Sequence, residues 1–490
     1  IYSDYSDPDV IRRKDNYYMI ASSFNHTPGI PILKSKNLVD WKLIGYIFEQ
    51  LPFDKYKDVR HGEGAWAPSL RYHDNKYYAC IPFPDDGIYV SSCTDIEKGD
   101  WTEPWCLIPL KGLEDPCPIW IGKKCYMVVG FAKSRIGFNS CLGLYEVTPD
   151  LKHQISETYT IIYDGHHMNP TIEGPKFNTR NGWIYIMAPA GSVKTGWQVC
   201  LRSKNIYGPY EAKIVLMQND SPVNGPHQGA LIDLKNDEWA FVHFQDMKCY
   251  GRICHLEPVK WVNDWPLCGM VRDELLAGSP VSSSEYLIPK KSNYKIQTSD
   301  MFTSDKLGLM WQTPANKQSH WYELNQGLVL NCYYHNEKSK KALHLMPNTF
   351  LTKLAFPSFK VTSLCQLKLV HDGDEVGLCY MGSSYTYICV VRQKGVNHLQ
   401  VRRGAFNQDE DVVIFDSLYK NQEIEFLLKF VYPGKYQLGF NNMFFKENYL
   451  ALPGRWIGGK IGIYARGIST GGFGRFKFFK VRKVKNETRG

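Results

Sequence analysis

The sequence predicts an all-β protein in which a five-bladed β-propeller precedes a β-sandwich. Three observations support this prediction. Apolar residues recur at helical spacing almost nowhere in the 490 residues, whereas short runs of aromatic and β-branched residues recur throughout. One strand–turn–strand unit repeats five times before about Leu287. Beyond that point the repeat stops, and short alternating runs separated by turn residues continue.

Each repeat contains a polar turn followed by an aromatic strand. In the first repeat Lys14-Asp15-Asn16 precedes Tyr17-Tyr18, and in the fifth Lys235-Asn236-Asp237 precedes Glu238-Trp239. The five aromatic markers are Tyr18, Tyr78, Tyr126, Tyr185 and Trp239. They lie roughly 50–60 residues apart, which is enough chain for a four-stranded sheet, and units of this period arranged around a channel are typical of propellers. Five units therefore predict five blades.

The chain after the repeats is expected to form a second domain. Pro289-Lys290-Lys291-Ser292-Asn293 has the composition of a linker. Alternating runs such as Val376-Gly377-Leu378-Cys379-Tyr380 follow, separated by turns such as Asp372-Gly373-Asp374. Such runs are typical of a sandwich. We expect a propeller over residues 1–288, a linker over 289–298 and a sandwich over 299–490.

Composition and charge exclude several classes of function. The net charge of +9 is spread along the chain, and its densest basic run, residues 475–489, alternates with Phe and Val like a terminal strand. We therefore expect no nucleic-acid partner. No run approaches the roughly 20 apolar residues of a membrane helix, so no membrane partner is expected. Oligomeric state is not predicted.

The 14 cysteines include no CxxC pair. Several lie in apolar strand-like runs, where a free thiol behaves as a small hydrophobic side chain. This pattern slightly favours the cytoplasm. A periplasmic or secreted location stays open, because a leader can have been removed.

Roughly ten residues upstream of each marker, the chain carries a functional group beside a proline or glycine. Equivalent positions in the blades of a propeller lie at one radius and height, so these groups should meet at one mouth of the channel. Three of them are carboxylates. The five segments are Asp7-Pro8, Trp66-Ala67-Pro68, Asp115-Pro116, Glu173-Gly174-Pro175 and Gly225-Pro226-His227-Gln228-Gly229.

Convergent carboxylates suit the hydrolysis of an acetal. One group must protonate the leaving oxygen while an ionised group activates water on the opposite face of the sugar. A third carboxylate raises the pKa of the acid by like-charge repulsion. Each of the three acids taken alone is better explained by a turn or an edge cap, and it is their equivalent placement in separate repeats that favours chemistry. His227 alone fits a core residue, a metal ligand or a substrate contact.

These segments resemble glycoside hydrolase family 43, the β-xylosidases and α-L-arabinofuranosidases that attack hemicellulose. The resemblance spans the whole chain, since the two-domain branch of that family ends in a concanavalin-like jelly-roll sandwich. The matching stretches are Tyr5-Ser6-Asp7-Pro8-Asp9-Val10-Ile11-Arg12, Trp66-Ala67-Pro68-Ser69-Leu70-Arg71-Tyr72, Glu114-Asp115-Pro116, Pro170-Thr171-Ile172-Glu173-Gly174-Pro175, Pro226-His227-Gln228-Gly229 and Tyr250-Gly251-Arg252.

The resemblance implies a role for each residue. Asp7 corresponds to the general base, Glu173 to the general acid, and Asp115 to the carboxylate that tunes and orients the acid. Arg252 matches the arginine that faces the substrate, and His227 matches a central histidine beside which many members hold a metal ion, often calcium. No cofactor is implied as required, and the calcium ion is optional. Further candidates for the sugar pocket are Phe24, Trp66, Trp197 and Gln245.

One departure from the family pattern concerns the base. The first segment reads Asp7-Pro8-Asp9, whereas many relatives carry a small residue in place of Asp9. Asp7 is chosen because the residue before the proline matches the base of the family, and Asp9 is expected to be a supporting or turn residue.

The expected activity is inverting and exo-acting, and it releases terminal α-L-arabinofuranose from hemicellulose side chains or oligosaccharides. The substrate partner is thus an oligosaccharide or polysaccharide. A β-D-xylosidase or a dual enzyme is the alternative within the family. From another class of protein, a non-catalytic carbohydrate-binding propeller is the alternative. We expect the sandwich to buttress the propeller and wall off the pocket, although polysaccharide binding is also compatible with its sequence.

Overall fold

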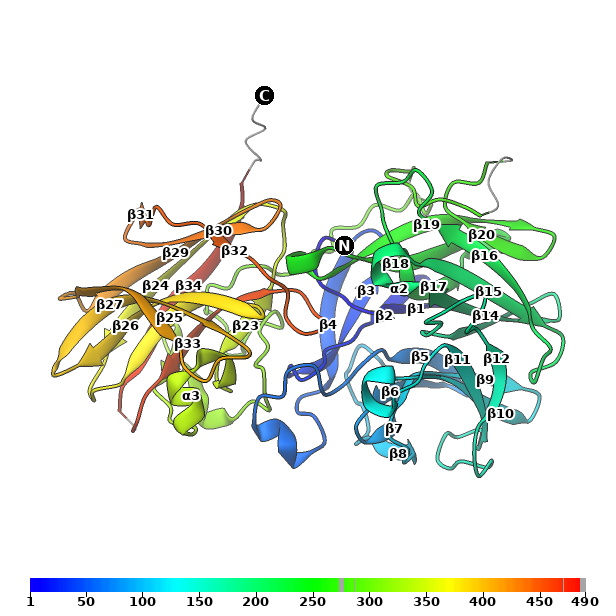
Figure 1. The fold of residues 1–490 in the computed structure, drawn as a ribbon, viewed down its shortest axis with the longest axis horizontal. Helices are drawn as coiled ribbons and strands as arrows, with labels where there is room; N and C mark the ends of the chain where they lie inside the picture. Colours follow the sequence, from blue (N-terminus) through cyan, green and yellow to red (C-terminus); the bar gives the residue numbers. More distant parts are fainter. Residues whose placement is uncertain (273–276, 286, 470, 485–490) are drawn as a thin grey trace.

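The computed structural model describes residues 1–272, 277–285, 287–469 and 471–484, which form two β domains side by side (Figure 1). Helices are few and short. Those in the described part are η1 (Asp54–Lys57), α1 (Lys133–Ile136), α2 (Ser192–Thr195), η2 (Lys235–Asp237), η3 (Lys248–Tyr250), η4 (Ser319–Trp321), α3 (Glu337–Lys341) and η5 (Leu343–Leu345). None is long and apolar enough to cross a membrane.

The first domain consists of five antiparallel four-stranded sheets, each built from consecutive strands. The first sheet is β1 (Asp9–Arg13), β2 (Asn16–Ile20), β3 (Gly29–Ser35) and β4 (Trp41–Phe48), and the second is β5 (Ser69–His73), β6 (Lys76–Phe83), β7 (Gly87–Cys93) and β8 (Trp105–Ile108). The third is β9 (Leu113–Ile121), β10 (Lys124–Phe131), β11 (Cys141–Val147) and β12 (Thr160–Asp164). The fourth is β13 (Lys176–Arg180), β14 (Trp183–Ala190), β15 (Trp197–Ser203) and β16 (Glu211–Met217). The fifth is β17 (His227–Asp233), β18 (Trp239–Asp246), β19 (Arg252–Val262) and β20 (Trp265–Cys268).

The sheets are arranged as blades in a closed ring. The first strand of each sheet contacts that of the next, from β1 through β5, β9 and β13 to β17, and β17 contacts β1 again. These five strands therefore line the channel. All five aromatic markers fall in the second strand of a sheet, namely β2, β6, β10, β14 and β18. The predicted propeller is confirmed, and the number of sheets agrees with the predicted number of blades.

The apolar core of this domain lies between neighbouring blades. One cluster joins Ile20 and Ile32 of the first sheet to Leu70 and Ile81 of the second. A second strand such as β10, which is buried at every position after Lys124, has blades on both of its faces. This double coverage explains why the second strands are near-continuous apolar runs rather than alternating ones.

The second domain is a sandwich of an eight-stranded and a six-stranded sheet, consistent with the expected concanavalin-like fold. The large apolar cluster between the sheets includes Phe359, Phe426 and Phe476. The first sheet contains β21 (Tyr322–Leu324), β22 (Leu328–Asn331), β24 (Phe359–Lys368), β29 (Glu423–Val431), β30 (Lys435–Phe440), β31 (Met443–Phe444), β32 (Tyr449–Leu450) and β34 (Phe473–Lys483). The second contains β23 (Phe350–Lys353), β25 (Glu375–Met381), β26 (Ser384–Gln393), β27 (Val396–Ala405), β28 (Val412–Leu418) and β33 (Lys460–Arg466).

Two sequence expectations concern the ends of these domains. The basic run over 475–489 forms most of β34, as expected of a terminal strand, although residues 485–490 lie outside the described part. Residues 289–298, the expected linker, contain no helix or strand.

All fourteen cysteines lie in the described part and are free.

The seam between the first and fifth blades is held by Asp4, which contacts both domains. Asp4 Oδ1 accepts a hydrogen bond from the backbone N–H of Arg252 at 2.9 Å. Its Oδ2 accepts one from the N–H of Gly458 in the sandwich at 2.9 Å, and its carbonyl accepts one from Lys353. One residue thus ties the two ends of the ring to each other and to the second domain.

Candidate active site

One mouth of the channel holds a pocket of about 210 Å³. Asp7, Trp66, Asp115 and Glu173 all line it, and each lies in the segment that leads into, or begins, an inner strand. The structure therefore brings the three predicted carboxylates together from three blades. The complete lining is Asp7, Phe24, Trp66, Ala67, Glu114, Asp115, Ala132, Lys133, Ser134, Asn139, Glu173, Gln228, Arg252 and Trp456.

Asp7 lies between a hydroxyl and a guanidinium group. Ser22 Oγ donates to Asp7 Oδ2 at 2.5 Å, and Arg252 Nη1 lies 2.9 Å from Oδ1. Arg252 also lies over the ring of Phe244, with 4.8 Å between Cζ and the ring centroid. Because the ionised carboxylate is what these donors stabilise, Asp7 is arranged as a hydrogen-bond acceptor.

The backbone before Arg252 requires a glycine. Gly251 has φ +78°, and a Cβ there would lie 2.4 Å from Cγ of Asp4. A side chain at this position would therefore push Asp4 away from the N–H of Arg252. This close approach explains the Tyr250-Gly251-Arg252 motif.

Glu173 is held by the histidine of the fifth blade. Glu173 Oε1 lies 2.7 Å from His227 Nε2. The Glu173 side chain is 33% exposed, whereas that of His227 is 1% exposed. Burial acts to raise the pKa of Glu173, but the hydrogen bond and charge of His227, together with the charge of Arg252, lower it below its usual value.

Asp115 is buried beneath Glu173 and accepts two hydrogen bonds. The N–H of Gly174 donates to Oδ2 at 2.9 Å, and Gln228 Nε2 donates to Oδ1 at 3.1 Å. Gly174 has φ +60°, and a Cβ there would meet Gln228 at 2.8 Å, so the position needs glycine. Burial, followed by the negative charge of Glu173, raises the pKa of Asp115 to about 7.

The pocket therefore retains a carboxyl proton close to neutral pH. Repulsion between Asp115 and Glu173 was expected to raise the pKa of Glu173, but the raised pKa falls on Asp115. The reason is His227, whose ring favours the ionised form of Glu173 while Asp115 has no cation within ion-pair distance in the described part. Two such carboxyls titrate as a pair, and the shared proton can occupy either.

Aromatic side chains form one wall of the pocket. The Phe24 and Trp66 rings lie 5.9 Å apart, and Arg135 lies over Trp66 at 4.6 Å. Trp456, whose ring centroid lies 6.5 Å from that of Trp66, comes from the sandwich. The second domain thus contributes a side chain to the pocket of the first.

Two predicted pocket residues are not brought to this mouth. Neither Trp197 nor Gln245, both in the described part of the chain, lines the pocket. Trp197 Nε1 donates to Asn169 Oδ1 at 3.0 Å. Gln245 Nε2 donates to Asn224 Oδ1 at 2.7 Å, and its Oε1 lies 3.1 Å from His255 Nε2. Their polar atoms are occupied by these protein contacts, which holds the side chains away from the pocket.

Among the lining residues that sequence reasoning did not assign are Glu114, Gln228 and Trp456. Glu114 and Gln228 lie inside the matched segments, beside Asp115 and His227, so their places in the repeat could have identified them. Burial, followed by the charge of Asp115, raises the pKa of Glu114 well above its usual value. Trp456 reaches the pocket because the two domains pack together, and no sequence motif near it indicates this.

The described residues do not form a protein-ligated calcium site at His227. No group of three or more His, Cys, Asp or Glu side chains within the described part could hold a metal ion. Calcium prefers six to eight oxygen ligands, whereas His227 directs Nε2 to Glu173 and leaves a buried Nδ1 without a partner. A calcium ion held through water near His227 stays a hypothesis, and no chemical step is assigned to it.

Comparison with known proteins adds to this geometry. Residues 1–266 match the family model Glycosyl hydrolases family 43. The chain belongs to this family. Residues 299–482 match the model of the Beta xylosidase C-terminal Concanavalin A-like domain. The chain therefore has the two-domain organisation that its motifs suggested, and family 43 is a family of glycoside hydrolases.

Individual family-43 proteins are similar over most of the chain. A putative beta-xylosidase of Xylanibacter ruminicola is 38% identical over 318 residues, covering 64% of this chain and 59% of that protein. The non-reducing end alpha-L-arabinofuranosidase BoGH43B of Bacteroides ovatus is 26% identical over 349 residues, covering 65% and 61%. The chain thus matches about six tenths of the length of these curated relatives. A solved structure described as Bacteroides ovatus Xyloglucan PUL GH43B has the same fold, with a TM-score of 0.81, 21% identity and 98% of each chain covered.

Proposed function

We propose that this family-43 protein is an inverting, exo-acting glycosidase that removes a terminal pentose from hemicellulose oligosaccharides or side chains. The observation that carries the proposal is the convergence of Asp7, Asp115 and Glu173 in one pocket, each with a different set of partners. Two carboxyls of opposite protonation state are what inversion at an acetal carbon requires.

In the proposed mechanism Asp7 is the general base. Arg252 and Ser22 stabilise its ionised form, so Asp7 can accept a proton from the attacking water as that water bonds to the anomeric carbon. Arg252 also fixes the direction of the carboxylate, because it is itself held by Asp4 and Phe244.

Glu173 is the proposed general acid. It is more exposed than Asp115 and can reach a leaving oxygen, whereas Asp115 is 4% exposed and lies behind it. A substrate that displaces water from the pocket desolvates Glu173 more than the already buried Asp115, and this favours the shared proton on Glu173. Glu173 then gives this proton to the leaving oxygen as the glycosidic bond breaks. Asp115 acts through Glu173, as a positioning and tuning residue.

The size of the pocket supports action on a chain end. Its volume of about 210 Å³ is below the roughly 300–1,000 Å³ of sites for drug-sized ligands. One sugar ring fits such a space better than a stretch of polysaccharide.

Two terminal sugars are candidates. The relative that is 38% identical is named a putative beta-xylosidase, and this name supports β-D-xylose as the first candidate. α-L-Arabinofuranose, expected first from the sequence motifs, is supported by the more distant arabinofuranosidase of Bacteroides ovatus and becomes the second candidate. Xylopyranose and arabinofuranose present similar hydroxyl arrangements, so an enzyme that acts on both is compatible with the pocket.

The deciding experiment compares the rates on nitrophenyl β-D-xylopyranoside and nitrophenyl α-L-arabinofuranoside and follows the freshly released sugar by proton NMR. We expect turnover of at least one substrate and an initial product of inverted anomeric configuration. Retention of configuration would contradict the roles given to Asp7 and Glu173. Turnover of neither substrate would contradict the pentosidase assignment.

A Glu173→Gln variant separates this proposal from a carbohydrate-binding propeller without catalysis. We expect kcat to fall by about 10³-fold or more, with the smallest loss for substrates whose leaving groups need no protonation. Glu103→Gln, on the surface of the second blade, serves as a control that should keep full activity. Equal hydrolysis by Glu173→Gln and Glu103→Gln would exclude Glu173 as the acid.

A further inference from the structure

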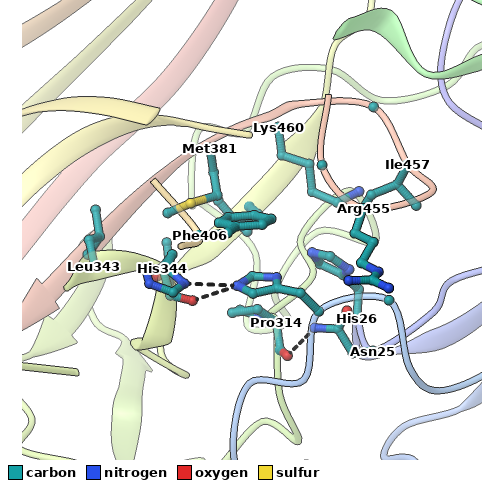
Figure 2. A pocket seen from close by; sticks show the side chains of 16 residues that line it. Asn25, His26, Pro314, Leu343, His344, Met381, Phe406, Arg455, Ile457 and Lys460 are labelled. Carbon is teal, nitrogen blue, oxygen red and sulfur yellow. Dashed lines mark hydrogen bonds between the residues drawn. The ribbon is translucent and has the colours of Figure 1, made fainter. Parts of the chain in front are cut away.

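A small cavity between the two domains is lined by basic but not acidic side chains. Its volume is about 20 Å³, which is room for one water-sized particle. His26 and His61 line it from the propeller, and His344, Arg455 and Lys460 line it from the sandwich (Figure 2). No Asp or Glu of the described chain is among its lining residues.

Lys460 is a buried cation without a partner. It is 4% exposed and makes no ion pair or hydrogen bond within the described part of the chain. Lys353 lies directly opposite Lys460 on β23, so both side chains leave the same face of the sheet. Lys353 donates to the carbonyl of Asp4 and lies 4.2 Å from the ring centroid of Tyr5, whereas Lys460 has no direct partner among the described residues and only the more distant charge of Asp4 partly offsets its own. Burial, followed by the charge of Lys353, lowers the pKa of Lys460 to about 7.

Two further donors reach the same space. His26 is buried, and its Nδ1 has no hydrogen-bond partner. Arg455 is exposed at the edge of the cavity, where it packs against Gly62, lies 6.0 Å from the ring centroid of Trp456 and forms no ion pair within the described residues. Figure 2 shows Lys460, Arg455 and His26 on one side of the cavity and His344 with Phe406 on the other.

On the opposite wall of the cavity, His61 and His344 already have hydrogen-bond partners. His61 Nε2 lies 3.0 Å from the carbonyl of His344, and His344 Nε2 lies 3.2 Å from the carbonyl of Gln408. The His61 ring stacks on Phe406 with centroids 3.8 Å apart. These rings therefore form a fixed wall. The buried donors without partners among the described residues are those of Lys460 and His26, and the exposed Arg455 lies beside them.

We propose that this cavity is a binding site for one small inorganic monovalent anion of the size of chloride, held by Lys460, Arg455 and His26. A buried unpaired cation is costly, and an anion among three donors compensates it. A volume of about 20 Å³ fits a monatomic anion better than sulfate, phosphate or a sugar acid. Since its lining residues come from both domains, the anion would strengthen their association.

The first test measures thermal unfolding of the full chain in chloride and in gluconate at equal ionic strength, because gluconate is too large for the cavity. We expect the midpoint to be about 2–4 °C higher in saturating chloride, from preferential binding to the folded state. Lys460→Met should abolish this difference, whereas the surface variant Lys420→Met should retain it. Replacement of a buried unpaired lysine by methionine of similar volume is compatible with folding.

The second test locates the ion directly. Crystals soaked in bromide should show an anomalous peak in contact with Lys460, and the peak should be absent from Lys460→Met and weakened in Arg455→Gln. A cavity without bromide, together with equal unfolding midpoints in chloride and gluconate, would overturn the proposal. It would mean that the cavity holds water beside a neutral Lys460. Neither outcome bears on the proposed hydrolysis.

Discussion

The two ends of the propeller channel are built from the same five strands, but the carboxylates at the two ends have different partners. At the active mouth, Asp115 and Glu114 have no cation within ion-pair distance among the described residues, and Glu173 has a histidine. At the other end, a larger cavity of about 580 Å³ is lined by Asp9, Arg12, Arg71, Lys176 and Asp233. There Asp9 lies 2.7 Å from Arg71, and Asp233 is paired with Arg12.

Asp7 and Asp9 show the difference at two neighbouring positions. Asp9 is 1% exposed, and its Oδ2 accepts from both Arg71 and the N–H of Leu70 at 2.7 Å, so that oxygen is fully used for structure. Asp7 is also paired with an arginine, Arg252, but it faces the pocket and shares it with three other acids. At the far end both carboxylates are paired with arginines, whereas at the active mouth Asp7 has such a partner and Asp115 and Glu114 have none among the described residues. This supports Asp9 as the supporting residue that the sequence suggested.

The largest expected effect separates these two aspartates. Asp7→Asn should lower kcat by about 10³-fold, because water loses its general base. Asp9→Asn should leave kcat within about twofold but lower the free energy of unfolding by of the order of 3 kcal/mol, since it breaks a buried ion pair with Arg71. Steady-state kinetics and urea unfolding of both variants check this. A greater loss of kcat in Asp9→Asn than in Asp7→Asn would reverse the assignment.

The second prediction concerns the shared proton. Activity should fall as the pH rises through about 7, because the pocket then loses the proton that the pair of Asp115 and Glu173 holds. In Asp115→Asn, kcat should fall by about 10²-fold and the alkaline limb should move to lower pH, since one like charge is gone. The pH dependence of kcat/KM provides the measurement. An unchanged alkaline limb would show that Asp115 does not tune the acid.

The same substitution should stabilise the protein. The pKa of Asp115 is raised to about 7 in the folded chain, against about 3.9 when unfolded. The stabilisation linked to its extra proton is fully present below pH 3.9 and is lost as the pH rises through 7. Asp115→Asn should therefore unfold about 2 °C above the unsubstituted protein at pH 8, with a smaller gain near pH 4. A lower midpoint at pH 8 would contradict the sign.

A smaller effect is expected at the wall that the sandwich supplies. Trp456→Ala should raise KM by roughly fivefold with little change in kcat, because the ring contacts bound sugar but not the reacting atoms. Val412→Ala, at an exposed edge of the same domain, is the control. A fall in kcat without a rise in KM would instead assign Trp456 a part in the chemistry.

The smallest expected effect follows removal of metal ions. Dialysis against EDTA should leave kcat/KM unchanged, since the proposed acid and base are held in place by protein groups. A loss of activity that calcium restores would establish the optional ion near His227 as functional.

The sequence was sufficient for the propeller and for its carboxylates because both depend on a repeat. The aromatic markers fix the second strand of every blade, and one offset from them locates Asp7, Asp115 and Glu173. Positions that are equivalent in every blade can therefore be predicted from the spacing of the repeat in the sequence.

Other features depend on contacts that no repeat encodes. The side chains of Trp197 and Gln245 occur on the expected blades but face Asn169 and Asn224. Trp456 reaches the pocket because two domains pack together. The distribution of the proton between Asp115 and Glu173 depends on His227, which comes from the fifth blade. Such tertiary contacts override local pattern.

Asp4 has a consequence for how the molecule comes apart. Each described sheet uses consecutive strands, so the ring is closed by contacts between the first and last blades and not by a shared strand. Among these contacts are backbone hydrogen bonds of Ile1 and Tyr5 with β19. At this joint Gly458 and Lys353 of the sandwich donate hydrogen bonds to Asp4. The side chain of Arg252, which follows the same joint, donates to Asp7. The sandwich therefore helps to keep the ring closed. Its unfolding would remove the contacts that hold Asp4 beside Arg252, the residue that orients the proposed base Asp7.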